Sequence, residues 1–172
     1  NTDLSTTGFS GRDTGWMGRH FEYLYPDYLS DFPGSRPEGP AAIQVGNYGS
    51  LVFEGEETNY AFVTNNIDQL EQIAETGLQY SVEDSLFDNC MYSDQIKFLR
   101  GVSNVTNEYA GTIHEAYMRG ANQIEYQNNG FARQLALLAR LIKGNLGTKV
   151  YMISMGGFDT HGNQPLVHER LM

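Results

Sequence analysis

A short apolar run that ends in two glycines constrains the fold of this chain more than any other feature of its sequence. In residues 150–155 both alternating sets of side chains are largely apolar. A strand with this pattern is covered on both faces, which is typical of a parallel sheet flanked by helices. Gly156 and Gly157 then let the backbone turn without Cβ clashes. We therefore expect an interior parallel strand at residues 150–155, with a helix at residues 131–143 packed on one of its faces.

Two polar residues, Asp159 and His161, follow this strand directly. Ligands of parallel α/β sheets bind in the crevice at the carboxyl ends of the strands. Two positions apart on an extended loop, the carboxylate and the imidazole project to the same side, and this pair of donors suits zinc, manganese or iron. The pair predicts half of a divalent metal site, with both side chains converging on one cavity. The alternative interpretation is structural: Asp159 caps the following turn and His161 bonds to the backbone.

A third candidate ligand, His168, lies about one turn into a helix that Pro165 is suited to begin. It is a candidate for a third metal ligand or for an outer-shell partner of the first two. His20 and His114 lie in helical segments, where a single histidine more often serves packing or faces solvent.

The strand, the two glycines and the residues after them resemble a bacterial family of the alkaline phosphatase and sulfatase superfamily, known as domain of unknown function 1501. The matching residues are Gly156, Gly157, Phe158, Asp159, Thr160, His161, Asn163, Gln164, His168 and Leu171. Residues 14–19, 131–142 and 147–151 are also similar to that family, and residues 40–46 more loosely. The resemblance implies an alkaline phosphatase-like α/β fold, with a mainly parallel sheet flanked by helices and a loop-rich insertion.

The same resemblance implies a metal ion held by Asp159 and His161, with zinc first and manganese, iron or calcium as alternatives. It also implies export, so a bacterial periplasmic, secreted or cell-surface location is expected. Family members carry an Asp-bearing first strand and a Ser-His-Phe stretch upstream, and Ser-Glu-Phe-Gly-Arg and Asp-His-Gly segments downstream. These are not found in this sequence. We therefore expect residues 1–172 to be one incomplete domain, completed by missing flanking segments or by partner chains, as in an oligomer or surface assembly.

The charge of the chain excludes several classes of partner. Eleven Lys and Arg residues against 21 Asp and Glu give a net charge of −10. Such a surface argues against nucleic acid and against anionic membranes, and it repels phosphate and sulfate esters unless a local cation such as a metal attracts them. No apolar run reaches the length of about 18 residues that a membrane-spanning helix needs. Cys90 is the only cysteine, so no internal disulfide can form, and Asn104-Val105-Thr106 matches a glycosylation acceptor triplet.

The remaining patterns predict further elements. We expect a helix at residues 15–25 capped by Thr14, short strands at residues 41–45, 51–53 and 59–64 forming a hairpin or meander, and an amphipathic helix at residues 67–78. A helical region at residues 92–126 is expected to break near Gly101 or Gly111.

Three functions are consistent with these patterns. The first is a metal-dependent hydrolase of phosphate or sulfate esters, whose nucleophile the sequence does not identify. The second is a non-catalytic surface or assembly protein that retains the fold, and the third is a carbohydrate- or peptide-binding module built on loops rich in Tyr and Asn. Because Asp159 and His161 supply only two firm ligands, we expect the chain alone to be inactive.

Overall fold

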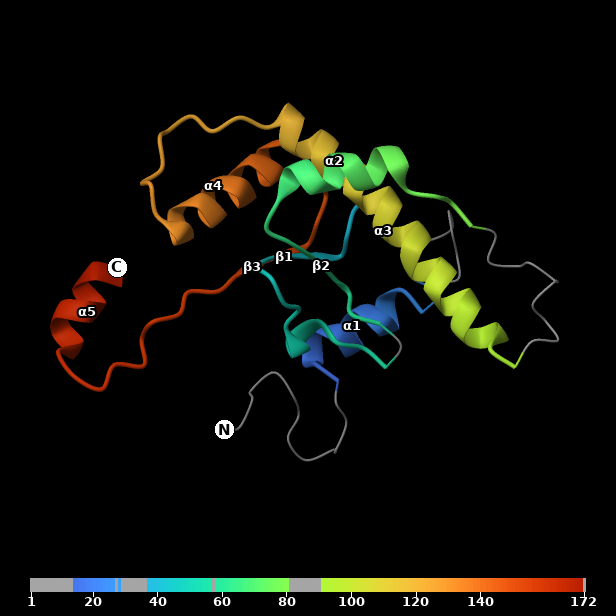
Figure 1. The fold of residues 1–172 in the computed structure, drawn as a ribbon, viewed down its shortest axis with the longest axis horizontal. Helices are drawn as coiled ribbons and strands as arrows, with labels where there is room; N and C mark the ends of the chain where they lie inside the picture. The colour runs from blue at the N-terminus through green and yellow to red at the C-terminus, as the bar shows by residue number, and fades with distance from the viewer. Residues whose placement is uncertain (1–13, 27, 29–36, 57, 81–90, 172) are drawn as a thin grey trace.

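The computed structural model describes residues 14–171 except residues 27, 29–36, 57 and 81–90, and Cys90 therefore lies outside the described part. Helices and short strands alternate along the chain (Figure 1). In order they are α1 (Trp16–Leu24), β1 (Ala42–Val45), the 3-10 helix η1 (Leu51–Phe53), β2 (Ala61–Thr64), α2 (Ile67–Thr76), α3 (Ser93–Arg119), α4 (Gly130–Lys143), β3 (Val150–Ile153) and α5 (Gln164–Leu171).

The three strands form one parallel sheet in the order β2-β1-β3. Ala42 of β1 is in register with Ala61 of β2 and with Val150 of β3. All four residues of β1 are buried, because this strand has a partner on each side and helices above and below. The expected α/β class with a parallel sheet flanked by helices is confirmed.

The position predicted for the strand at residues 150–155 is wrong in one respect. β3 is parallel, but within the described residues it lies at the edge of the sheet and ends at Ile153. Its four residues are only partly buried, since β1 covers one side of the strand and no described strand covers the other.

The hairpin or meander expected at residues 41–64 is also wrong. β1 and β2 are parallel, and residues 51–53 form the 3-10 helix η1 instead of a strand. The buried Gln44 side chain redirects the backbone after β1: its Nε2 donates to the Tyr48 carbonyl (2.8 Å) and its Oε1 accepts from the Ser50 N–H (2.8 Å). The chain therefore leaves the sheet, and β2 returns beside β1 in the same direction. The antiparallel pairing that remains in the described part of this segment is a single bridge between Glu54 and Asn59.

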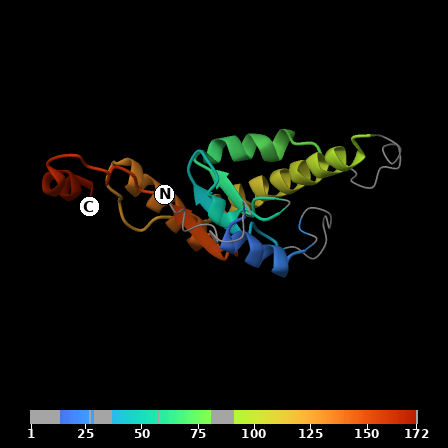
Figure 2. The same cartoon turned by 90° about the horizontal axis from the view of Figure 1, so that it is seen from below.

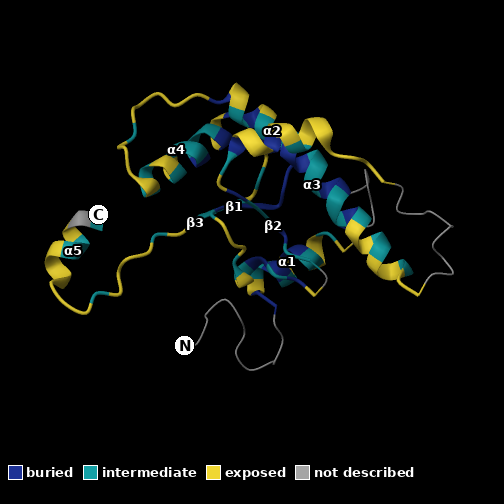
Figure 3. Ribbon diagram, in the orientation of Figure 1, coloured by how far each residue is buried: buried dark blue, intermediate teal, exposed yellow. Residues whose placement is uncertain are grey.

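Helices cover both faces of the sheet. Figure 1 shows α2, α3 and α4 on one side and α1 with η1 on the other. Figure 3 shows that the buried residues gather on the sheet and on the inward surfaces of these helices. Phe21 of α1 packs against Tyr60, with ring centroids 6.1 Å apart. Thr14 does not cap α1 as expected, because Gly15 occupies the N-cap position and the Thr14 hydroxyl accepts a hydrogen bond from Arg19 (3.0 Å).

Helix α3 runs for 27 residues without the predicted break. Gly101 is buried, and a Cβ atom at Gly111 would lie 3.6 Å from the Ala74 Cβ of α2, an ordinary contact distance. Asn104 is only 1% exposed, and it clamps residue 80: its Nδ2 donates to the Tyr80 carbonyl and its Oδ1 accepts from the Tyr80 N–H, both at 2.7 Å. The Asn104 amide is therefore inaccessible as a glycosylation acceptor in the folded chain.

The C-terminal ends of α3 and α4 meet and satisfy each other's carbonyl groups, an arrangement we call the crossed C-terminal caps. Arg119, at the end of α3, donates to the Gly144 carbonyl (3.1 Å from Nη2), and Arg140 of α4 donates to the Gly120 carbonyl (2.8 Å from Nε). A Cβ atom at Gly144 would lie 1.8 Å from the Ala116 carbonyl oxygen, so only glycine permits this approach. The cationic side chains suit the negative ends of the two helix dipoles.

The expected helix at residues 131–143 is confirmed as α4. Asn129 caps its N-terminus, because Asn129 Oδ1 accepts from the Ala132 N–H (2.8 Å). None of the helices that the structure describes combines the length and apolar character needed to cross a membrane.

Candidate functional site

The candidate site lies on the segment that leaves the sheet at the carboxyl end of β3. Residues 154–163 carry the chain away from the sheet to α5, and Figure 2 shows α5 on the side of the molecule opposite the N-terminal end of α3. Gly157 has φ = 95°, in the left-handed region that residues with a Cβ atom rarely adopt. The Gly-Gly pair therefore allows the turn that the sequence predicted.

Asp159 and His161 face one another on this segment. The distance between Asp159 Oδ2 and His161 Nε2 is 3.8 Å, and both side chains are 92% exposed. Two ligands of one tetrahedral zinc ion stand about 3.4 Å apart when each metal–ligand bond is about 2.1 Å. A small side-chain rotation would therefore let both atoms bind one ion. The two side chains meet on the open surface of the loop, and not within a cavity as we expected.

The structural interpretation of this pair receives no support from its contacts. In the part of the chain that the structure describes, the polar contact of each side chain is with the other. Thr160, between them, has a buried hydroxyl oxygen without a hydrogen-bond partner among the described residues. The exposed side of the loop therefore presents a carboxylate and an imidazole, and this pair of donors fits a divalent cation.

His168 holds the loop instead of joining the pair. Its Nε2 lies 3.3 Å from the Phe158 carbonyl oxygen, and its ring contacts the Phe158 ring edge-on at 5.3 Å between centroids. Across the described ranges, no three His, Cys, Asp or Glu side chains gather closely enough to hold one metal ion. His168 thus contacts the segment that carries Asp159 through Phe158, and it does not join Asp159 and His161 in one cluster.

The other histidines lie elsewhere. His20 is exposed on α1, and His114 of α3 lies 3.9 Å from Glu71 Oε2 on α2. In β3, burial raises the pKa of Tyr151 above its ordinary value of 10.0, so this phenol stays neutral near pH 7 and is not a base.

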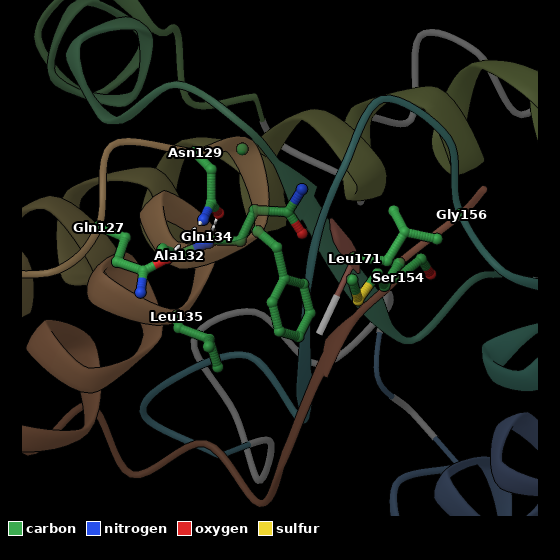
Figure 4. A pocket seen from close by; sticks show the side chains of 11 residues that line it. Gln127, Asn129, Ala132, Gln134, Leu135, Ser154, Gly156 and Leu171 are labelled. Carbon is green, nitrogen blue, oxygen red and sulfur yellow. Dashed lines mark hydrogen bonds between the residues drawn. The ribbon is translucent and has the colours of Figure 1, made fainter. Parts of the chain in front are cut away.

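A cavity of about 570 Å³ adjoins the segment that leads into the loop (Figure 4). It lies between the N-terminal half of α4 and residues 154–156, with one residue of α5 on its border. Its lining residues are Gln127, Asn129, Gly130, Phe131, Ala132, Gln134, Leu135, Ser154, Met155, Gly156 and Leu171. Residue spacing does not predict this cavity, because its lining joins residues of α4 to residues 154–156.

Comparisons with known proteins do not assign this chain to a family. No protein-family model, no curated protein and no solved structure matches the sequence or the structure.

Proposed function

We propose that this chain carries part of the metal site of a metal-dependent hydrolase of phosphate or sulfate esters, on an alkaline phosphatase-like α/β scaffold. The observation that carries the proposal is the 3.8 Å approach of Asp159 Oδ2 to His161 Nε2 on the loop after a parallel strand. The resemblance of residues 156–161 to the alkaline phosphatase and sulfatase superfamily supports it. Zinc is the ion that a carboxylate and an imidazole together suit best.

A bound metal ion would offset the negative charge of the chain at the site. At −10, the surface repels dianionic esters, and a bound divalent ion supplies the local positive charge that attracts them and stabilises charge on the transferred group. Asp159 binds through its carboxylate and His161 through the neutral imidazole. Gly157 allows the turn, and His168 fixes the loop through the Phe158 carbonyl. Because a hydrolytic zinc site takes about three protein ligands, a further donor joins this pair.

Metal titration of the full chain tests the first half of the proposal. We expect Zn²⁺ to bind with one-to-one stoichiometry in calorimetry, and Asp159→Asn and His161→Gln each to weaken binding at least about tenfold, since each removes one of few ligands. His20→Gln is the matched control, because His20 is an exposed histidine on α1, and it should leave the affinity unchanged. Equal affinities in all four proteins would refute the metal site.

Oxyanion binding tests the second half. The zinc-loaded chain should bind inorganic phosphate or sulfate, and the metal-free chain should not, because the ion provides the attraction. Metal binding without oxyanion binding would refute the hydrolase and leave a metal-binding loop in a non-catalytic protein. p-Nitrophenyl phosphate and p-nitrophenyl sulfate then report turnover directly, and we expect none from residues 1–172 alone.

A further inference from the structure

A second cavity, of about 300 Å³, lies between the C-terminal end of α3 and the middle of α4. It differs in charge from the larger cavity, because two arginines of α4 contribute to its wall. Its lining residues are Tyr117, Asn122, Arg133, Ala136, Leu137 and Arg140. Its volume is at the lower end of the roughly 300–1,000 Å³ typical of small-molecule sites, so it suits a small occupant.

The part of the chain around this second cavity is positively charged. Residues 119–149 contain five Lys and Arg residues and a single acidic residue, Glu125, which gives this segment a charge of +4 in a chain whose net charge is −10. Helix α4 itself carries Arg133, Arg140 and Lys143 and no acidic residue. An anion is therefore attracted to this surface and repelled by the acidic remainder of the chain.

Arg140 is held in place at the wall of this cavity. Its Nε donates to the Gly120 carbonyl (2.8 Å), and its guanidinium carbon lies 3.7 Å from the centroid of the Tyr117 ring. The hydrogen bond from Nε leaves the two Nη groups as the remaining donors. Among the described residues these Nη atoms have no hydrogen-bond partner, and no carboxylate pairs with the side chain. A positioned guanidinium with unpaired donors is suited to bind an anion.

Arg133 supplies a second guanidinium from the same face of α4, because it lies seven residues, or about two helical turns, before Arg140. Its Nη1 donates to Asn128 Oδ1 (3.1 Å), and in the part of the chain that the structure describes its other N–H groups are unpaired. A guanidinium presents its donors in a planar fork that matches the two oxygens of a carboxylate. A carboxylate has about four acceptor sites, so a single one can accept from both arginines.

The uncharged part of the wall selects the kind of anion. The side chains of Ala136 and Leu137 and the ring of Tyr117 are apolar, and Asn122 Nδ2 is already engaged, since it donates to the Ala136 carbonyl (3.1 Å). Inorganic phosphate or sulfate would lose hydration against these apolar groups and gain no contact from them. A carboxylate joined to an apolar group accepts hydrogen bonds from the arginines and also buries its apolar part.

We propose that this second cavity binds a small organic acid, in which one carboxylate is joined to an apolar body. The carboxylate accepts hydrogen bonds from Arg133 and Arg140, and the apolar body packs on Ala136 and Leu137. The proposal does not rest on the proposed hydrolase function, because no residue of this cavity is a metal ligand. The attraction for the acid comes from the arginines, so binding needs no metal.

An NMR titration of the ¹⁵N-labelled full chain, without metal and at constant ionic strength, tests the proposal. The probes are butyrate, benzoate and phenylacetate, each up to about 20 mM, a range that detects millimolar binding. We expect at least one of them to shift the backbone amide signals of Asn122, Ala136 and Leu137, which line the cavity, and to leave that of Gly77 unchanged. Benzamide has the shape of benzoate without its charge, and inorganic phosphate has charge without an apolar body. Neither should shift these signals at the same concentration.

Three variants assign the contacts. Arg133→Gln changes an exposed side chain and should weaken carboxylate binding at least about fivefold, since it deletes a charge-assisted hydrogen bond. Arg140→Lys keeps the charge but loses the planar fork, and it should weaken binding by a similar factor. Lys143→Gln is the matched control, because it removes one charge from an exposed position of the same helix that does not line the cavity. It should change the affinity less than about twofold, since salt screens exposed charges.

Three results would overturn the proposal. The absence of shifts at Asn122, Ala136 and Leu137 with every carboxylate would leave Arg140 with its role in the crossed C-terminal caps alone. Equal shifts with benzoate and benzamide would show that the charge of the ligand is irrelevant. Equal weakening by Arg133→Gln and Lys143→Gln would reduce the effect to the general positive charge of α4.

Discussion

Replacing Gly144 with alanine tests the crossed C-terminal caps that fix α4 against α3. The backbone of Gly144 has φ −74° and ψ 1°, which alanine also adopts, so the cost of the substitution comes from contact alone. The new Cβ would lie 1.8 Å from the Ala116 carbonyl oxygen, whereas real Cβ atoms essentially never approach within 3.0 Å. The two helix ends must therefore separate by more than an ångström, a distance that also stretches the hydrogen bonds of Arg119 and Arg140.

The size of the effect follows from these contacts. Overpacking of this kind costs about 1–3 kcal/mol. Loss of the charge-assisted hydrogen bonds that Arg119 and Arg140 donate adds about 1 kcal/mol, a low value because the Arg119 side chain is 55% exposed and screened by water. Gly144→Ala should therefore lower the free energy of unfolding by about 2–4 kcal/mol and the melting temperature by about 6–12 °C.

Urea denaturation followed by far-ultraviolet circular dichroism measures this change, and Gly130→Ala is the matched control. Gly130 begins the same helix, and a Cβ atom there would have no atom within 4 Å. That variant should be as stable as the wild type or more stable by about 0.5–1 kcal/mol, since alanine favours the helix. If the two variants were equally stable, α3 and α4 would not meet at Gly144 as described.

Three further changes give separate expectations. Leu141→Ala removes a side chain that is 0% exposed at the base of α4 and should cost about 2–5 kcal/mol in urea denaturation; a cost under about 1 kcal/mol would contradict its burial. Asn104→Ala deletes both hydrogen bonds to residue 80, so stability should fall by about 1–3 kcal/mol and the Tyr80 amide should exchange with solvent faster in hydrogen-exchange NMR; unchanged exchange would argue against the clamp. Burial raises the pKa of Tyr151 in the folded state, so the unfolded chain ionises at a lower pH than the folded chain. The stability that the neutral, buried phenol contributes is therefore fully present below about pH 10 and is lost as the pH rises through the raised pKa. Tyr151→Phe should therefore lose less stability than the wild type between pH 9 and pH 11, and parallel pH profiles would exclude Tyr151 as the cause.

Sequence patterns within a single segment predict the positions of the helices, because contacts within that segment determine where a helix begins and ends. The helix predicted at residues 131–143 begins within one residue of the observed start of α4, and Pro165 marks the first turn of α5. Strand direction was not predictable in the same way. β1 and β2 are close in sequence, which favours a hairpin, but the Gln44 hydrogen bonds turn the chain out of the sheet before β2 forms. Burial of Gly101 and the fit of Gly111 against α2 outweigh the low helix propensity of glycine in α3.

The sequence predicts one part of the candidate site and does not predict the other. The approach of Asp159 to His161 follows from their spacing on one loop, and the sequence predicts it. The cavity does not follow from spacing, because it joins residues of α4 to residues 154–156 after β3. The related feature of the sequence is that α4 has more apolar side chains than the core buries. Leu135 is 38% exposed on the same helix whose Leu141 is fully buried.

The parallel pairing of β1 with β3 has a consequence for the order in which the protein folds. Residue 42 pairs with residue 61 of β2, 19 positions away, and with residue 150 of β3, 108 positions away. Closing the longer connection costs more chain entropy and contributes to slow folding, so we expect β1, β2 and α2 to assemble before β3 docks. The loop with Asp159 and His161 is attached to the last strand to arrive. We expect the amides of β3 to exchange through opening of that strand alone, at a lower free energy than global unfolding, so that an ion bound at the loop would protect β3 more than β1 or β2.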